Sequence, residues 1–144
     1  MTEVTDVLPD LHKWNAGAGI SPDDWIYLEG RADHALGFCS FFWPEFTELD
    51  GYVLRLPLDV ERLRSWEQAG HSKQQVETAM NAFLFDHMFP DDETEPSLKS
   101  VQLKRLATIM SDMLATKLNR DFPDRCFSAF VLEVADFGLA FHQT

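Results

Sequence analysis

The first part of the chain alternates between apolar positions at helical spacing and glycines. Leu8, Leu11 and Trp14 recur every three residues and are followed by Gly17 and Gly19. Apolar residues at this spacing indicate a helix face, and glycine is the usual residue just beyond a helix end. The first expected element is therefore a short helix that ends at the two glycines.

The segment ISPDDW carries a strong helix start signal. Ser21 can cap the helix, Pro22 suits its first position, and Asp24 can complete a capping box. Ile20 and Trp25 flank the cap as a hydrophobic staple. Asp24 therefore has a structural role before any functional role is considered.

Apolar residues then continue at three- and four-residue spacing into the segment GFCSFFWPEF. These positions are Leu28, Ala32, Ala35, Cys39 and Phe42. One interpretation is a continuous helix across Gly30 and Gly37, with these positions in the core. The other is a helix that ends near either glycine, followed by FCSFFW as a short buried strand. We favour the helix, which must end before Pro44 because proline disfavours a helical residue in front of it.

The middle of the chain predicts one strand and two capped helices. The sequence DGYVLRL follows an Asp-Gly turn with alternating positions, which is typical of a short strand over residues 52–56. Asp59 and Ser72 can each serve as the N-cap of a following helix. The second helix carries an apolar stripe that we expect to be buried: Val76, Met80, Phe83, Leu84, His87 and Met88.

The last third predicts a long helix and a β-hairpin. The helix runs from about Ser97 to Arg120 and contains most of the basic residues of this part of the chain. Its apolar side consists of Leu103, Leu106, Met110, Met113, Leu114 and Leu118. The hairpin pairs residues 126–134 with residues 139–142 across a turn at residues 135–138.

These elements predict an α+β fold in a single domain over residues 1–144. The domain is mainly helical, with a small antiparallel sheet formed by the C-terminal hairpin, to which residues 52–56 can add a strand. Hydrophobic residues make up 45% of the chain, which is enough for a packed core.

The net charge of the chain indicates which kind of partner to expect. The chain has 24 acidic and 12 basic residues, a formal net charge of −12 at pH 7. Residues 1–61 hold 12 of the acidic residues but only 3 of the basic ones. A field of this sign repels the phosphates of nucleic acids and anionic lipids and attracts basic proteins. We therefore expect a basic protein partner, and neither nucleic acid nor a membrane.

The two cysteines, the N-terminal pattern and the length of the apolar runs indicate where in the cell the protein is expected. Cys39 and Cys126 lie in apolar segments and form no CxxC or Cys/His spacing, so we expect buried free thiols. The N-terminus lacks a signal-peptide pattern, and no apolar run approaches the roughly 18–20 residues that span a bilayer. The expected location is the cytoplasm.

Candidate catalytic and metal-binding chemistry is sparse. Asp86, His87 and Asp91 offer oxygen and imidazole donors for a divalent ion, but no metal-binding motif organises them. We identify no nucleophile motif and no glycine-rich phosphate loop, and we predict no catalytic residue, no cofactor and no resident metal. His87 also falls on the predicted apolar stripe, which favours a structural role.

Several segments together resemble small bacterial proteins of the immunity type, which are acidic single domains that neutralise interbacterial toxins. The segments are WNAGAGI with Trp25, FFWPEF followed by DGYVL, and FPDRCFSAFVLE followed by DFGLAFHQ. The resemblance implies a class of role, the neutralisation of a toxin by binding, and it transfers no catalytic residue.

The sequence therefore favours a binding or inhibitor protein whose partner is a basic toxin domain. The expected contact residues are Asp23, Asp24, Trp43, Glu45, Glu48 and Asp50. An alternative is a small enzyme or ligand-binding domain with a pocket between sheet and helices, near His87. The oligomeric state stays open between monomer and homodimer, the latter joined through the aromatic segment.

Overall fold

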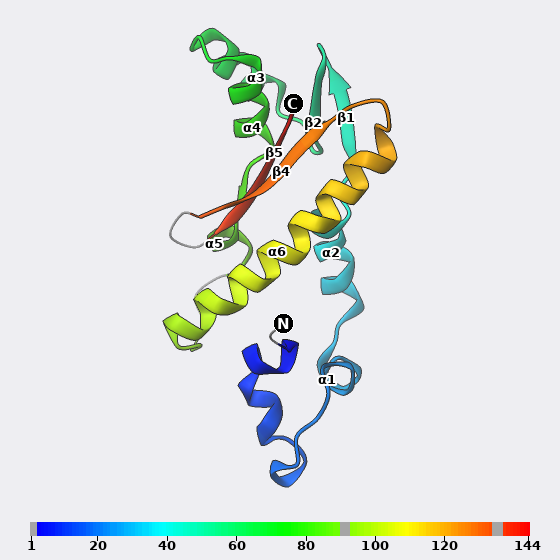
Figure 1. The fold of residues 1–144 in the computed structure, drawn as a ribbon, viewed down its shortest axis with the longest axis vertical. Coiled ribbons are helices and arrows are strands. Elements are labelled where there is room, and N and C mark those ends of the chain that lie inside the picture. The colour runs from blue at the N-terminus through cyan, green and yellow to red at the C-terminus, as the bar shows by residue number, and fades with distance from the viewer. Residues whose placement is uncertain (1–2, 90–92, 134–136) are drawn as a thin grey trace.

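The computed structural model describes residues 3–89, 93–133 and 137–144. It combines helices with two small antiparallel sheets, which confirms the α+β class (Figure 1). The 3-10 helices are η1 (Val4–Val7), η2 (Pro9–Lys13) and η3 (Asn15–Gly17). The α-helices are α1 (Pro22–Glu29), α2 (Ala32–Phe42), α3 (Val60–Gln68), α4 (Lys73–Asn81), α5 (Phe85–Met88) and α6 (Pro96–Asp121). The strands are β1 (Phe46–Leu49), β2 (Tyr52–Arg55), β3 (Phe83–Leu84), β4 (Phe127–Leu132) and β5 (Gly138–Gln143).

Helix α6 runs diagonally along the molecule and packs against β4 (Figure 1). Its buried residues are Leu103, Ala107, Met110, Leu114 and Leu118. Spacings of three and four residues place these side chains on one side of the helix, as the sequence predicted. Among the described helices, α6 included, none combines the length and hydrophobicity that crossing a bilayer requires.

Helix start signals read from the sequence are confirmed. The Asp24 backbone N–H donates to Ser21 Oγ at 3.1 Å, and the Ser21 N–H donates to Asp24 Oδ2 at 3.4 Å. Asp59 accepts a hydrogen bond from the first turn of α3, and Ser72 caps α4 with Gln75 completing the box. The segment before α1 differs from the prediction, since it forms three 3-10 turns instead of one helix.

Strand β2 forms where the sequence predicted a strand, but its partner differs. It pairs with β1 through a two-residue turn in which Asp50 and Gly51 have positive φ, 51° and 82°. Two left-handed residues match the twist of a tight hairpin, and glycine adopts that conformation without strain. β2 therefore forms a two-stranded sheet with β1 and does not extend the sheet of the C-terminal hairpin.

The predicted C-terminal hairpin is confirmed as β4 and β5, which pair in antiparallel register. Strand β3 adds to the other side of β5, giving the strand order β3-β5-β4. The turn predicted at residues 135–138 lies largely outside the described residues.

The prediction of one helix with a buried apolar stripe from Val76 to Met88 is wrong. Helix α4 ends at Asn81, the chain then forms β3 and α5, and the His87 side chain is 78% exposed. The Asn81 side chain bonds to the backbone of β2, and β3 pairs with the start of β5, so the polypeptide turns where the sequence pattern continues.

The segment FCSFFW is helical, as favoured, but it does not continue α1. Gly30 has an extended backbone, with φ of −66° and ψ of 145°, and separates α1 from α2. The predicted core positions Leu28, Ala32, Ala35 and Cys39 are exposed. The half-buried positions are Phe38, Phe41 and Phe42, because α2 turns only this side toward the rest of the molecule.

Both cysteines are free and exposed, so the prediction of buried thiols is wrong. Cys39 is exposed on α2 beside the half-buried phenylalanines, and Cys126 precedes β4 in a loop. Hydrophobic neighbours in the sequence do not bury a side chain that points away from the core.

Candidate protein-binding site

Helices α1 and α2 present hydrophobic side chains to solvent. Within the part of the chain that the structure describes, neither helix contains a buried residue. The most exposed of their hydrophobic side chains are Ile26 at 58%, Tyr27 at 83%, Leu28 at 64% and Leu36 at 73%. We call the exposed side chains between Pro22 and Phe42 the α1–α2 surface.

This exposure is unusual for the sequence of α1. The helix contains four consecutive hydrophobic residues, Trp25 to Leu28, which cover all sides of one helical turn, and a turn that is hydrophobic on all sides is normally buried at least in part. Among the four, Trp25 is half-buried and the other three are exposed. Clustered exposed hydrophobic side chains bordered by polar residues are typical of interaction sites.

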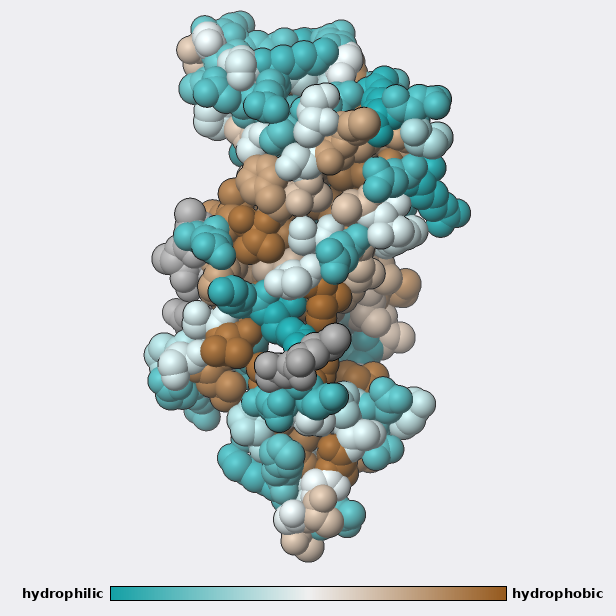
Figure 2. Space-filling view, viewed as in Figure 1, coloured by the Kyte–Doolittle hydropathy of each residue, from teal (hydrophilic) through white to brown (hydrophobic). Residues whose placement is uncertain are grey.

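The position of α1 in the molecule explains its exposure. Figure 1 shows α1 near one end of the long axis, beside the N-terminal 3-10 turns and away from both sheets. Figure 2 shows that hydrophilic side chains cover the opposite end, around α3, while hydrophobic side chains reach the surface along α6 and near the N-terminal turns. The chain is elongated, so its N-terminal end has few elements available to cover it.

Carboxylates surround the α1–α2 surface. Asp23 and Glu29 lie at the two ends of α1, and neither has an ion-pair partner among the described residues. Asp33 accepts two hydrogen bonds from Arg31, at 3.1 Å and 2.6 Å. These bonds, with a further one from the His34 backbone, hold the pKa of the Asp33 carboxyl below its ordinary value, so it is ionised at neutral pH. The surface is thus hydrophobic with a negative border.

Two hydrophobic cavities lie along α2. One, of about 460 Å³, lies between α2, β3 and α5, and the other, of about 480 Å³, lies at the junction of α1 and α2. Both are lined in part by His34 and Phe38, so they adjoin each other along the helix. The first is lined by Phe38, Phe41, Phe83, Leu84 and Met88, with His34, Gly37 and His87.

Arg55 fixes the end of α2 next to the first cavity. Its guanidinium lies 4.6 Å from the ring centre of Phe41 and 5.1 Å from that of Phe83. Its Nη2 donates to the Ser40 carbonyl at 3.0 Å, while its buried Nε has no partner in the described structure. Burial lowers the pKa of Arg55 from its ordinary value, and the two rings supply the cation–π contact in place of a carboxylate. This packing keeps the two phenylalanines in place as cavity walls.

The predicted contact residues do not form one surface. Asp23 and Asp24 lie on the first turn of α1, whereas Glu48 and Asp50 lie on the β1–β2 hairpin near the other end of the molecule (Figure 1). Asp24 is engaged by the capping box, and Glu48 forms an ion pair with Arg125 at 2.6 Å. Their assignment as partner contacts stays a prediction.

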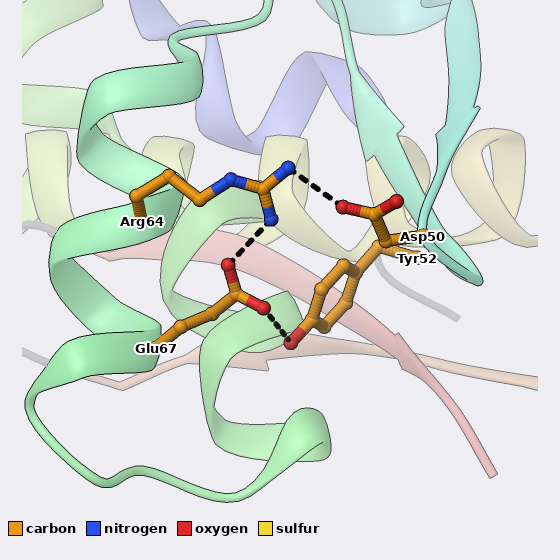
Figure 3. A network of polar contacts seen from close by, with 4 residues as sticks. All are labelled: Asp50, Tyr52, Arg64 and Glu67. Atoms are coloured by element: carbon orange, nitrogen blue, oxygen red, sulfur yellow. Dashed lines mark hydrogen bonds and ion pairs between the residues drawn. The ribbon is translucent and has the colours of Figure 1, made fainter.

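Asp50 belongs to a polar network within the chain (Figure 3). Arg64 donates to Asp50 Oδ2 and to Glu67 Oε1, both at 2.7 Å, and the Tyr52 hydroxyl donates to Glu67 Oε2 at 3.4 Å. Burial, and then the charge of Glu67, raises the pKa of Tyr52 above its ordinary value. The network ties the tip of the hairpin to α3, which gives Asp50 a structural role.

Trp43 lies at the surface, 37% exposed, at the end of α2. Lys117 and Arg120 of α6 each place their cationic group 5.9 Å from its ring centre. The neighbouring Glu45 carboxylate has no ion-pair partner among the residues described. Trp43, one of the expected contact residues, is thus at the surface but partly covered by cations of its own chain.

The candidate metal ligands do not converge. His87 Nε2 and Asp86 Oδ1 are 3.6 Å apart at the surface, and Asp91 lies outside the described residues. Across the described ranges, no group of three or more His, Cys, Asp or Glu side chains is arranged to hold a metal ion. Asp86 and His87 therefore form at most a surface pair.

Sequence reasoning missed the hydrophobic part of the site. Ile26, Tyr27 and Leu36 were not proposed as contacts, although the all-hydrophobic run in α1 was a visible signal. Comparison with protein-family models, with curated proteins and with solved structures found no match to this chain. The α1–α2 surface itself therefore carries the evidence on function.

Proposed function

We propose that this protein is an acidic, cytoplasmic binding protein that neutralises a basic protein, as a bacterial immunity protein neutralises a toxin domain. The observation that carries the proposal is the α1–α2 surface, where hydrophobic side chains are exposed within a border of carboxylates. The partner would cover the hydrophobic side chains and place basic residues opposite the carboxylates.

The hydrophobic contribution rests on side chains such as Tyr27 and Leu36. Burying a large hydrophobic side chain contributes roughly 1.5–3 kcal/mol, and aromatic residues dominate interface energetics. A partner that covers several of these side chains gains this free energy at each of them, and the sum counts against the free-energy cost of association.

The electrostatic contribution rests on the net charge of −12 and on the carboxylates around α1. Complementary charge mainly accelerates encounter, and salt screens it over about 8 Å at physiological ionic strength. Binding is therefore expected to be fast at low salt and to weaken as salt is added, while the hydrophobic contact remains.

The direct test is capture of the protein encoded by the neighbouring gene, at low and at high salt. A matched pair of variants tests the surface: Ile26→Ser on α1, and Ile109→Ser on α6, two exposed isoleucines at 58% and 44%. We expect Ile26→Ser to reduce capture about tenfold, given the hydrophobic free energy of one side chain, and Ile109→Ser to leave it unchanged. The proposal fails if no protein is captured and cells that express the neighbouring gene are not rescued.

A second candidate function, a ligand-binding or catalytic domain, is favoured by the cavity of about 460 Å³ between α2, β3 and α5. Its volume falls within the range of small-molecule sites, and His34 and His87 lie on its wall. No acidic residue lines it in the described structure, so a hydrophobic ligand suits it better than a metal ion. A ligand-dependent rise in the melting temperature would favour this function over protein binding.

A further inference from the structure

A larger cavity lies where the N-terminal 3-10 turns, α1 and the start of α6 meet. Its volume is about 720 Å³. Two tryptophans, Trp14 and Trp25, line it together with three acidic residues, Asp10, Glu93 and Glu95. No predicted contact residue lies among its lining residues, so it is separate from the set expected from the sequence.

The two indole rings make this cavity suited to a cation. Tryptophan has the strongest cation–π attraction of the aromatic side chains, and both rings are half-buried, so part of each remains available. The chain already uses this contact elsewhere, since Lys117 and Arg120 each lie 5.9 Å from the ring centre of Trp43.

The acidic residues give the cavity negative charge in addition to the two aromatic rings. Glu95 accepts hydrogen bonds from the Ser97 hydroxyl and, at 3.1 Å, from the Leu98 backbone N–H. These bonds lower the pKa of the Glu95 carboxyl, which keeps it ionised. Lys13 neutralises Asp10 at 2.7 Å, so Glu93 and Glu95 leave the cavity with a negative excess.

We propose that this cavity binds an arginine side chain of the basic partner. A guanidinium stacks flat on an indole ring and donates to carboxylates in the same plane, which fits walls made of both groups. The source is a protein side chain because Trp25 is followed directly by the exposed residues Ile26 and Tyr27, so one helix presents both the cavity wall and the hydrophobic contact. This inference rests on the proposed function, since it names what the partner inserts.

The test uses the four tryptophan indole N–H signals of the 15N-labelled protein. The probe is a blocked Gly-Arg-Gly tripeptide, and the control is the same tripeptide with uncharged, isosteric citrulline. Trp→Phe variants assign the signals. We expect the arginine tripeptide to shift the Trp14 and Trp25 signals in a saturable manner, with no shift at Trp66, and the citrulline tripeptide to shift neither. Glu93→Gln should weaken binding about threefold, as removal of one exposed charge does, whereas Glu61→Gln on α3 should not.

Three results overturn the inference. The first is an equal response to the arginine and citrulline tripeptides, and the second is no response at Trp14 and Trp25. The third is a response to spermidine at much lower concentration than to the tripeptide, which would make a free polyamine the occupant.

The two proposals fail separately. If the tripeptide does not bind but the partner is still captured, the cavity is not an arginine site and the proposed function stands. Tripeptide binding with no captured partner removes the proposed function, and with it the assignment of the cavity to a partner's arginine.

Discussion

The Glu77 carboxylate accepts a hydrogen bond from the Val53 backbone N–H at 2.9 Å. A helix side chain thus occupies the place of a neighbouring strand on the open edge of β2. The same carboxylate accepts from the backbone N–H of Gln143 and, at 2.7 Å, from its side chain. Asn81, one turn further along α4, accepts from the Arg55 N–H and donates to the Val53 carbonyl, both at 2.9 Å.

Glu77 joins the two sheets, and Asn81 adds two further bonds to β2. They are the buried polar residues of the described structure, at 2% and 1% exposure, and they satisfy backbone groups that would otherwise lack partners. Helix α4 packs against β2 and against β5, where β3 pairs only with Gly138 and Leu139 and leaves the rest of that side of β5 without a neighbouring strand. This covering protects the strands from pairing with another chain.

Replacing Glu77 by the similarly sized glutamine should clearly destabilise the fold. Glu77→Gln places an amide donor against a backbone N–H donor, so we expect a loss of roughly 2–3 kcal/mol in the free energy of unfolding. Urea denaturation measures this loss. Glu61→Gln, at an exposed position on α3, is the control and should change stability by less than about 0.5 kcal/mol. Equal effects of the two substitutions would contradict the bridging role.

Two leucines test the difference between the core and the α1–α2 surface. Leu114 is 1% exposed and Leu36 is 73% exposed. Leu114→Ala should lower the free energy of unfolding by about 2–5 kcal/mol, because it leaves a cavity in the core. Leu36→Ala should change it by less than about 0.5 kcal/mol. A large loss at Leu36 would mean that α2 is covered within the chain, and the proposed binding surface would not exist.

Stability should depend on pH through Tyr52. Burial and Glu67 raise its pKa in the folded protein, so the unfolded chain releases the proton first as pH rises past the ordinary tyrosine pKa of about 10. The folded state then binds more protons than the unfolded state, and stability falls with increasing pH. Tyr52→Phe should reduce this fall, measured by urea denaturation between neutral and alkaline pH. Tyr27→Phe, at the exposed tyrosine, is the matched control and should keep it.

Both cysteines should react in the native protein. Cys39 and Cys126 are exposed and free, so a thiol reagent such as DTNB should modify two thiols per chain without denaturant. Cys39→Ser and Cys126→Ser should each leave one reactive thiol. Reaction only after unfolding would show that the side chains are buried, as the sequence had predicted.

Local signals explain which elements the sequence predicted correctly. The caps at Ser21, Asp59 and Ser72 act within one helical turn, so they form wherever the helix forms. The tight turn at Asp50-Gly51 depends on the conformational freedom of those two residues. The apolar stripe along α6 was predicted correctly because buried residues occur along most of this one helix, from Leu103 to Leu118.

Long-range contacts explain the errors. The spacing from Val76 to Met88 was helical, but the pairing of β3 with β5 takes residues 83–84 out of the helix. Cys39 matched a helical stripe, yet only the Phe38, Phe41 and Phe42 side of α2 meets other elements. Periodicity identifies a hydrophobic face, and it does not say whether another element is close enough to cover it.

The candidate site divides in the same way. The sequence by itself determined the acidic charge, the helix starts at Ser21, Asp59 and Ser72 and the presence of a hydrophobic run in α1, because these depend on composition and on neighbours within a turn. Only the tertiary structure decided that Ile26, Tyr27 and Leu36 remain exposed, that Glu48 and Asp50 are paired with arginines, and that Trp14 and Trp25 share a cavity. The physical reason is that exposure and pairing depend on which distant segments meet, and in this elongated chain few segments reach α1.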